Sequence, residues 1–146
     1  MNLTLTWQNK MSFEADIRGN KVPMDVKPES GGDDLGPTPK ELVLAGLAGC
    51  TGMDVAYVLN KMRAEFTGIS IETDAQTTKG EPSVFETVHL IYNVTSPSLP
   101  EDKLMRAVEL SQTKYCGVSA MIAKSAKIHY EVRLNGKTIG TGSAKF

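Results

Sequence analysis

Two cysteines are the residues of this chain with the clearest capacity for chemistry. Cys50 lies within a long apolar segment, and Cys116 lies far along the chain, directly before a glycine. In a reducing compartment such a pair is more often free, catalytic or redox-active than a permanent disulfide. A thiol peroxidase needs a thiolate, a nearby positive group, an apolar pocket and often a second thiol that resolves the sulfenic acid. The sequence contains candidates for each part.

The surroundings of Cys50 leave a structural role open. We expect it about three turns inside a helix, where the helix dipole no longer stabilises a thiolate strongly. A buried thiol without a nearby cation is an inert core residue, and free cysteines are commonly of that kind. Activation must therefore come from a residue elsewhere in the fold.

The spacing of potential metal ligands predicts no metal site and no cofactor. The chain contains no CxxC motif, and His89 and His129 are isolated in the sequence, with no other ligand at the spacing of a zinc site. Each histidine is expected at the surface of a strand.

Length and composition predict one domain spanning residues 1–146. The net charge of −1 and the lack of a basic stripe argue against a nucleic-acid partner. A membrane span is not expected, because Asp54 and Asn60 interrupt the longest apolar segment. No signal peptide is evident at the N-terminus, so a cytoplasmic location is predicted.

The elements that must position the cysteines centre on one long helix, predicted over 39–63. Thr38, Pro39 and Glu41 form a capping box with an early proline, a typical helix start. Apolar or small residues occupy nearly every face from 42 to 59, which predicts a mostly buried helix.

Three glycines in this helix, Gly46, Gly49 and Gly52, recur at every third position. Each costs about 1 kcal/mol relative to alanine. We expect close approach of another helix or of a bound group to this glycine ridge. A tight helix crossing with no functional role would also explain the three glycines.

The other elements alternate between strands and helices. Strands are expected at residues 3–8, 11–17, 22–26, 69–75, 84–94, 128–134 and 137–146. Hairpin turns are predicted at Gly19-Asn20 and Asn135-Gly136. A second helix should open at a Ser98-x-x-Glu101 capping box and break at Gly117. The result is an α+β pattern, in which the glycine- and proline-rich loop 27–38 is a candidate functional loop.

Three motifs in these elements resemble a known family. They are Pro39-x-Glu41-Leu42-x-Leu44-Ala45-x-Leu47-Ala48-x-Cys50, then Cys116-Gly117-Val118-Ser119, and Arg18-Gly19 in the N-terminal strands. Together they resemble the OsmC/Ohr family of osmotically inducible and organic hydroperoxide resistance proteins, and within it the OsmC-like branch. The resemblance covers almost the whole chain. It implies an OsmC-like fold and an intertwined homodimer, with central long helices and two active sites at the interface.

The resemblance also implies roles for individual residues. Cys50 matches the peroxidatic cysteine and Cys116 the resolving cysteine. Arg18 matches an arginine that reaches the thiol from the partner subunit. Glu41 is the candidate for the glutamate that holds this arginine, although Lys40 occupies the usual position of that glutamate. A shift of one residue along a helix rotates a side chain by about 100° around the helix axis, so Glu41 points in a different direction from the usual glutamate. Lys40 is therefore an alternative source of charge in the site.

The function implied is a thiol-dependent peroxidase that reduces organic hydroperoxides in oxidative stress defence, with an external dithiol as reductant. An apolar lining is expected that favours bulky peroxides over hydrogen peroxide. Its members would be Leu44, Leu47, Met53, Met121 and Ile122. A non-catalytic dimeric binder of a small apolar ligand, or a redox sensor, is the alternative.

Overall fold

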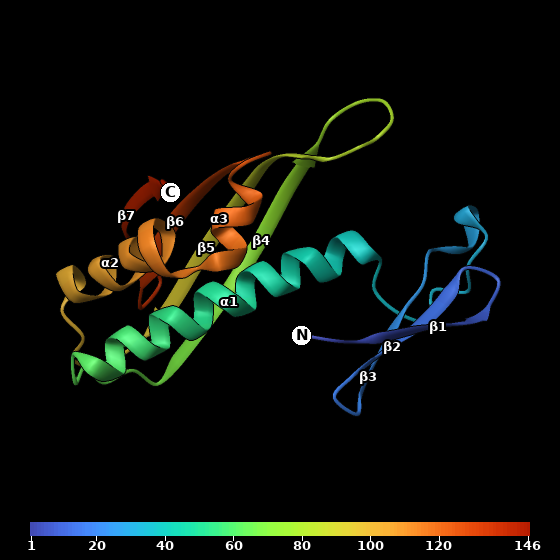
Figure 1. The fold of residues 1–146 in the computed structure, drawn as a ribbon. Coiled ribbons are helices and arrows are strands. Elements are labelled where there is room, and N and C mark those ends of the chain that lie inside the picture. The colour runs from blue at the N-terminus through green and yellow to red at the C-terminus, as the bar shows by residue number, and fades with distance from the viewer. The chain divides into compact units, whose positions relative to one another are not determined.

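A computed structural model describes residues 1–146 and confirms the α+β class, with three α-helices and two β-sheets (Figure 1). The chain forms two compact units, residues 1–45 and 46–146, and each is described separately here. The strands are β1 (Thr4–Asn9), β2 (Ser12–Ile17), β3 (Asn20–Met24), β4 (Gly68–Thr77), β5 (Phe85–Thr95), β6 (Lys127–Leu134) and β7 (Lys137–Ser143). The helices are α1 (Pro39–Lys61), α2 (Glu101–Leu110) and α3 (Gly117–Ile122), with a short 3₁₀ turn at Pro28–Ser30.

The 1–45 unit contains an antiparallel meander in which β2 pairs with β1 and β3. Ile17 pairs with Asn20, so the turn residues are Arg18 and Gly19, with φ angles of 55° and 83°. Positive φ at both positions is typical of the two-residue turns that suit twisted hairpins. The prediction of a Gly19-Asn20 turn was wrong by one residue. Asp16 explains the shift, because its Oδ1 accepts a hydrogen bond from the Gly19 N–H at 2.7 Å.

The loop that leads to α1 is held by the buried carboxylate of Asp25. This carboxylate accepts hydrogen bonds from the backbone N–H groups of Val26, Asp33 and Leu35. Burial raises the pKa of Asp25, but the three N–H donors outweigh it and keep the pKa below its ordinary value. The loop predicted as functional is thus ordered around one side chain.

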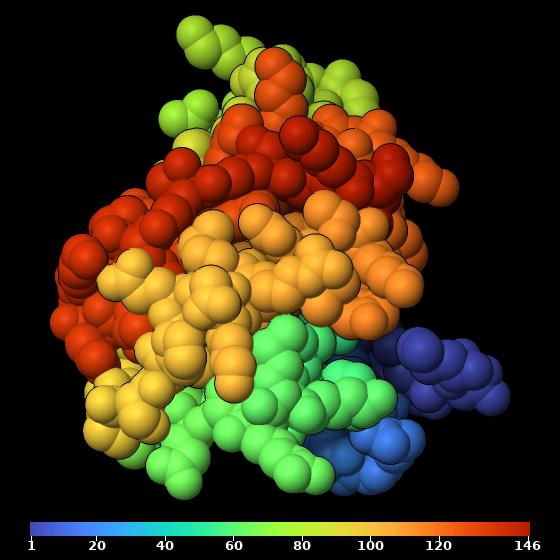
Figure 2. Space-filling model, turned by 90° about the vertical axis from the view of Figure 1, so that its left-hand side faces the viewer, coloured from blue at the N-terminus to red at the C-terminus, as the bar shows by residue number.

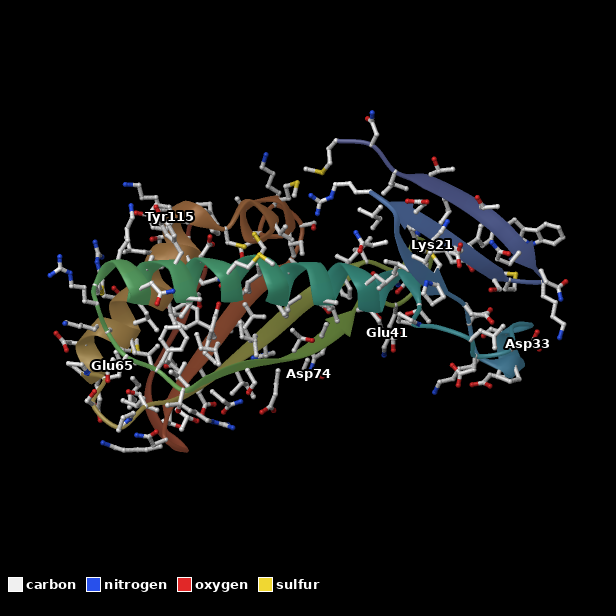
Figure 3. All side chains as sticks on the ribbon, turned by 90° about the horizontal axis from the view of Figure 1, so that it is seen from below. Lys21, Asp33, Glu41, Glu65, Asp74 and Tyr115 are labelled. Atoms are coloured by element: carbon white, nitrogen blue, oxygen red, sulfur yellow. The ribbon has the colours of Figure 1, made fainter.

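The start of α1 is the capping box that the sequence predicts. Glu41, at the N-terminal end of the helix in Figure 3, accepts from the backbone N–H of Thr38 at 2.7 Å. The Glu41 N–H in turn donates to the Thr38 hydroxyl at 3.4 Å. These bonds satisfy donors that a helix start leaves unpaired.

Helix α1 is less buried than its sequence indicates. Its buried residues, Leu47, Thr51, Val55, Val58 and Leu59, form a single face. The prediction of burial on nearly every face is therefore wrong for the single chain, because no element of the 46–146 unit covers the opposite face. By length and composition α1 would suffice to cross a membrane, with a mean hydropathy of 1.7 over 18 residues, but core helices meet the same criteria.

The glycine ridge has one close neighbour. A Cβ at Gly52 would lie 3.1 Å from Ile71 Cδ1, whereas Cβ atoms at Gly46 and Gly49 would meet no atom within 4 Å. Close approach therefore accounts for Gly52 alone within this chain.

The 46–146 unit is built on the sheet β4-β5-β6-β7. Strand β5 pairs antiparallel with β4 and parallel with β6, and β6 pairs antiparallel with β7. Alternate residues of β5 and β6 are buried on the helical side. The parallel pair requires a crossover, which α2 and α3 supply. Figure 2 shows α2 (yellow to orange) between β7 (red) and the C-terminal half of α1 (green).

The start of α2 differs from the prediction. The helix begins at Glu101 with Pro100 as its N-cap, and no side chain caps it. The Ser98-x-x-Glu101 capping box was wrong because the helix starts too late for Ser98 to reach it. The Ser96 hydroxyl instead accepts hydrogen bonds from the N–H groups of Ser98 and Leu99.

Candidate active site

The two cysteines, distant in sequence, meet in the 46–146 unit. The Sγ atoms of Cys50 and Cys116 and a carboxylate oxygen of Asp54 all lie within 4.8 Å of one another. Cys50 and Asp54 are four residues apart on α1, a spacing that places both side chains on one face. Cys116 precedes α3 and comes from the crossover. Both cysteines are free thiols.

A break in the helical crossover positions Cys116. After α2, residues Ser111–Tyr115 form a π-helical turn, and Cys116 itself is extended, with φ −69° and ψ 99°. Its N–H donates to the Ser111 carbonyl at 3.0 Å, and its Sγ accepts from the Ser119 N–H at 3.3 Å. The predicted break at Gly117 is confirmed, and the cysteine is the N-cap of the short helix that follows. π-Turns are frequent at functional sites.

Beneath the thiols lies a buried chain of hydroxyl groups that the sequence analysis did not predict. Ser111 Oγ donates to Asp54 Oδ2 at 2.9 Å. Because that uses the only Ser111 hydroxyl proton, the 2.7 Å bond between Thr51 and Ser111 is donated by Thr51, and the 2.6 Å bond between Tyr92 and Thr51 by Tyr92. Gln112 Nε2 donates to both Thr51 Oγ1 and Tyr92 OH. Each hydroxyl group therefore donates to the next one, from Tyr92 to Thr51 and from Thr51 to Ser111, and Ser111 donates to the Asp54 carboxylate.

A signal for this chain was present in the sequence. Thr51 and Asp54 are polar residues within the otherwise apolar stretch of α1. A buried polar side chain is costly without a partner, so such residues indicate a partner in another element. The partners were unpredictable, because they lie on β5 and on a π-helical turn.

Burial dominates the electrostatics of the site. It raises the pKa of Asp54 above its ordinary value, against the opposing hydrogen bond from Ser111. It also raises the pKa of the Cys116 thiol, with Ser119 opposing and the neighbouring Cys50 thiol adding to the rise. No positively charged side chain contributes to the Cys116 shift. A positively charged group that stabilises a thiolate at this site must therefore come from another residue of the protein or from a partner.

We expect the two thiols to differ in accessibility. Cys116 is fully buried with a raised pKa, whereas Cys50 is partly exposed. One equivalent of iodoacetamide at pH 7 should therefore alkylate Cys50 much faster than Cys116, because the reagent must reach the sulfur atom and burial disfavours the thiolate of Cys116. Peptide mass spectrometry of the reduced protein measures the ratio. Equal labelling at pH 7 would contradict the burial of Cys116.

Two of the predicted site residues lie in the other unit. Arg18 occupies the β2–β3 turn, and Glu41 is engaged in the capping box with Thr38. Both belong to residues 1–45, whereas the cysteines belong to residues 46–146. Their roles at the thiols stay predictions.

The residues predicted as apolar lining fall into different environments. Leu47 has an exposed fraction of 0% and belongs to the core. Met53, at 75%, and Met121, at 65%, are exposed, whereas Leu44 and Ile122 are partly exposed. Met53 borders an apolar groove of about 460 Å³. Ala48, Gly49, Gly52, Ala56, Phe66, Ile69 and Ile71 complete its lining.

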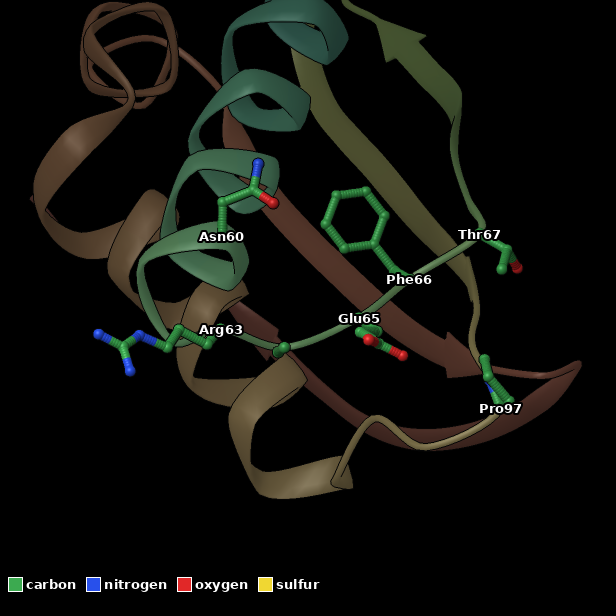
Figure 4. Close-up of a pocket in the computed structure, with 7 residues that line it drawn as sticks. Asn60, Arg63, Glu65, Phe66, Thr67 and Pro97 are labelled. Carbon is green, nitrogen blue, oxygen red and sulfur yellow. The ribbon is translucent and has the colours of Figure 1, made fainter.

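Neither this groove nor two further pockets of the unit are lined by a cysteine. One, of about 530 Å³, lies at the C-terminal end of α1 beside Arg63 and Phe66 (Figure 4). The other, of about 600 Å³, lies over the outer face of the sheet, where the rings of His89 and His129 stack with centroids 5.4 Å apart. His89 is exposed as predicted, and His129 Nδ1 lies 2.9 Å from the Ser143 hydroxyl.

Comparison with known proteins identifies the family. The family model "OsmC-like protein" matches residues 31–131. Protein YhfA of Escherichia coli is 30% identical over 135 residues, which cover 90% of this chain and 98% of YhfA. A crystal structure of a hypothetical protein from Aquifex aeolicus superposes with a TM-score of 0.78 at 28% identity, covering 92% of this chain and 96% of that one. The organic hydroperoxide resistance protein OhrB of Bacillus subtilis shares the fold, with a TM-score of 0.67 at 20% identity and coverages of 91% and 98%. The chain therefore belongs to the OsmC-like protein family.

Proposed function

We propose that this protein is a thiol-dependent peroxidase that reduces organic hydroperoxides in defence against oxidative stress. The observation that carries this proposal is the convergence of the Cys50 and Cys116 sulfur atoms within 4.8 Å. Several structural neighbours, OhrB among them, are named for resistance to organic hydroperoxides. That name supports the substrate class.

The proposed reaction has three steps. The Cys50 thiolate attacks one peroxide oxygen, the O–O bond breaks, and the alkoxide takes a proton from solvent to leave as an alcohol. Cys50 is then a sulfenic acid. The Cys116 thiol attacks that sulfur, and the hydroxyl group leaves as water with the thiol proton. An external dithiol supplies two electrons and two protons to reduce the resulting disulfide.

The position of Cys116 supports the second step. A disulfide needs sulfur atoms about 2.05 Å apart, so the two side chains must move closer. Cys116 lies at the junction of a π-helical turn and a short helix. Such a junction can adjust with less loss of hydrogen bonding than the interior of a regular helix.

Activation of Cys50 and dimer formation belong to the same proposal. A second copy of the chain would supply Arg18 near the thiol, held by Glu41, with Lys40 as the alternative source of charge. The exposed apolar face of α1, with Met53 and Tyr57, supports a homodimer, because contiguous apolar patches commonly mark interaction sites.

Thiol counting on the fully reduced protein tests the function. After one equivalent of cumene hydroperoxide we expect both thiols to disappear in the wild type. In Cys116→Ser we expect one thiol to be lost as a sulfenic acid that dimedone traps. Hydrogen peroxide should react more slowly than cumene hydroperoxide. Thiols that survive for hours in the wild type would overturn the peroxidase assignment.

A second candidate function is a non-catalytic dimeric binder of a small apolar ligand. The apolar groove beside Met53 favours it, because ligand sites are concave and mostly apolar. Surviving thiols, together with an apolar molecule released on denaturing the purified protein, would select this function.

A further inference from the structure

We propose that Cys50, Asp54 and Cys116 of the reduced protein bind a thiophilic divalent cation, with Zn²⁺ as the best match. The three side chains supply two sulfur atoms and one carboxylate oxygen from two different elements, all within 4.8 Å of one another. Two thiolates and a carboxylate are ligands that Zn²⁺ accepts. This site uses the thiols of the proposed peroxidase, but it requires no peroxide chemistry.

The distances fit a tetrahedral ion after a small adjustment. With Zn–S bonds of about 2.3 Å, two ligand atoms of a tetrahedral site lie about 3.8 Å apart. Atoms that already lie within 4.8 Å need to approach by at most about 1 Å. Cys50 and Asp54 are partly exposed, so the ion can enter and a water molecule can occupy the fourth position.

A chain of hydrogen-bonded hydroxyl groups holds the Asp54 carboxylate in the orientation that a metal ligand needs. Ser111 donates to one oxygen of Asp54 at 2.9 Å, and Thr51 and Tyr92 extend the chain behind Ser111. Metal-binding carboxylates are usually held by outer hydrogen bonds of this kind, which orient the remaining oxygen. The structure therefore holds the carboxylate in place before an ion arrives.

Ion binding and the thiol cycle would compete. Binding converts both thiols to thiolates and releases their protons, so affinity should increase with pH. A disulfide between Cys50 and Cys116 would remove both thiolate ligands. The bound ion would in turn occupy the sulfur lone pairs that attack a peroxide. The two states of the site are mutually exclusive.

Direct metal binding to the reduced, full-length protein tests the proposal. We expect one Zn²⁺ per subunit by competition with a chromophoric chelator. Co²⁺ should give the near-ultraviolet charge-transfer bands of thiolate ligation. Asp54→Asn can still accept a hydrogen bond from Ser111 but loses the carboxylate ligand. We expect it to weaken Zn²⁺ binding by at least about tenfold, because even the loss of a residue that only hydrogen-bonds to a ligand has an effect of that size. Cys50→Ser should weaken it further.

His89→Gln is the matched control, because the stacked pair His89 and His129 is the alternative zinc ligand set on this unit. We expect its zinc affinity to equal that of the wild type. Loss of binding in His89→Gln with unchanged binding in Asp54→Asn would overturn the proposal, as would a Co²⁺ spectrum without thiolate bands. Circular dichroism of each variant shows that it is folded. Zinc binding by a protein whose metal-free, reduced form does not turn over peroxide would reject the peroxidase and leave this site standing.

Discussion

Cys50→Ser is expected to lower kcat/KM for cumene hydroperoxide by at least about 1,000-fold, as the loss of a reacting nucleophile does in other enzymes. The serine hydroxyl is not ionised near neutral pH and cannot form a sulfenic acid, so no first step remains. Alcohol release, followed with an excess of dithiol reductant, measures the rate.

Cys116→Ser is the matched control for this experiment. It retains the attacking thiol, and we expect it to release one alcohol per subunit in a single rapid turnover before it slows. The structure places both sulfur atoms in one cluster. Each variant therefore replaces one sulfur atom of the same site with an oxygen atom. Steady turnover that persists in Cys50→Ser would show that the first step does not use this residue.

Leu47→Ala is expected to lower the free energy of unfolding by about 2–5 kcal/mol, the range for truncating a fully buried leucine. Leu47 has an exposed fraction of 0% and lies among the core residues of the 46–146 unit. Urea unfolding, at a fixed protein concentration because an oligomer would add stability, measures the change.

Met53→Ala is the comparison for Leu47→Ala, because both positions were predicted to line the substrate pocket. Met53 is 75% exposed in the single chain, so at a protein concentration low enough to keep the chain monomeric its truncation should change the free energy of unfolding by no more than about 0.5 kcal/mol. If Met53 contacts the peroxide, the KM for bulky substrates should rise instead. A large loss of stability in Met53→Ala with none in Leu47→Ala would contradict the assignment of the core.

Local signals in the sequence predicted the local parts of the fold. The Thr38–Glu41 capping box formed, and Asn135-Gly136 adopted the positive φ angles of a two-residue turn. Both depend only on neighbouring residues. The box at Ser98 failed because Ser96, outside the motif, accepts the N–H groups there.

The arrangement of the site could not be predicted from the sequence, because it depends on contacts between residues far apart in the chain that no short motif indicates. The approach of Cys116 to Cys50 follows from the parallel pairing of β5 with β6, which requires the crossover through α2 and α3. The resemblance to known family motifs, not spacing, connected the two cysteines. The hydroxyl chain at Thr51 was missed because its partners arrive from the same crossover and from β5.

The π-helical turn before Cys116 makes the thiol pair sensitive to residue number. The Cys116 N–H bonds to a carbonyl five residues earlier, whereas a regular α-helix would bond four residues earlier. Removing one residue from this turn would rotate the following chain by about 100°. Thr113, Lys114 and Tyr115 are exposed, so we expect substitutions at these positions to disturb the thiol pair less than a change in the number of residues. Single-residue deletions, and not a scan of substitutions, would reveal what keeps the two sulfur atoms together.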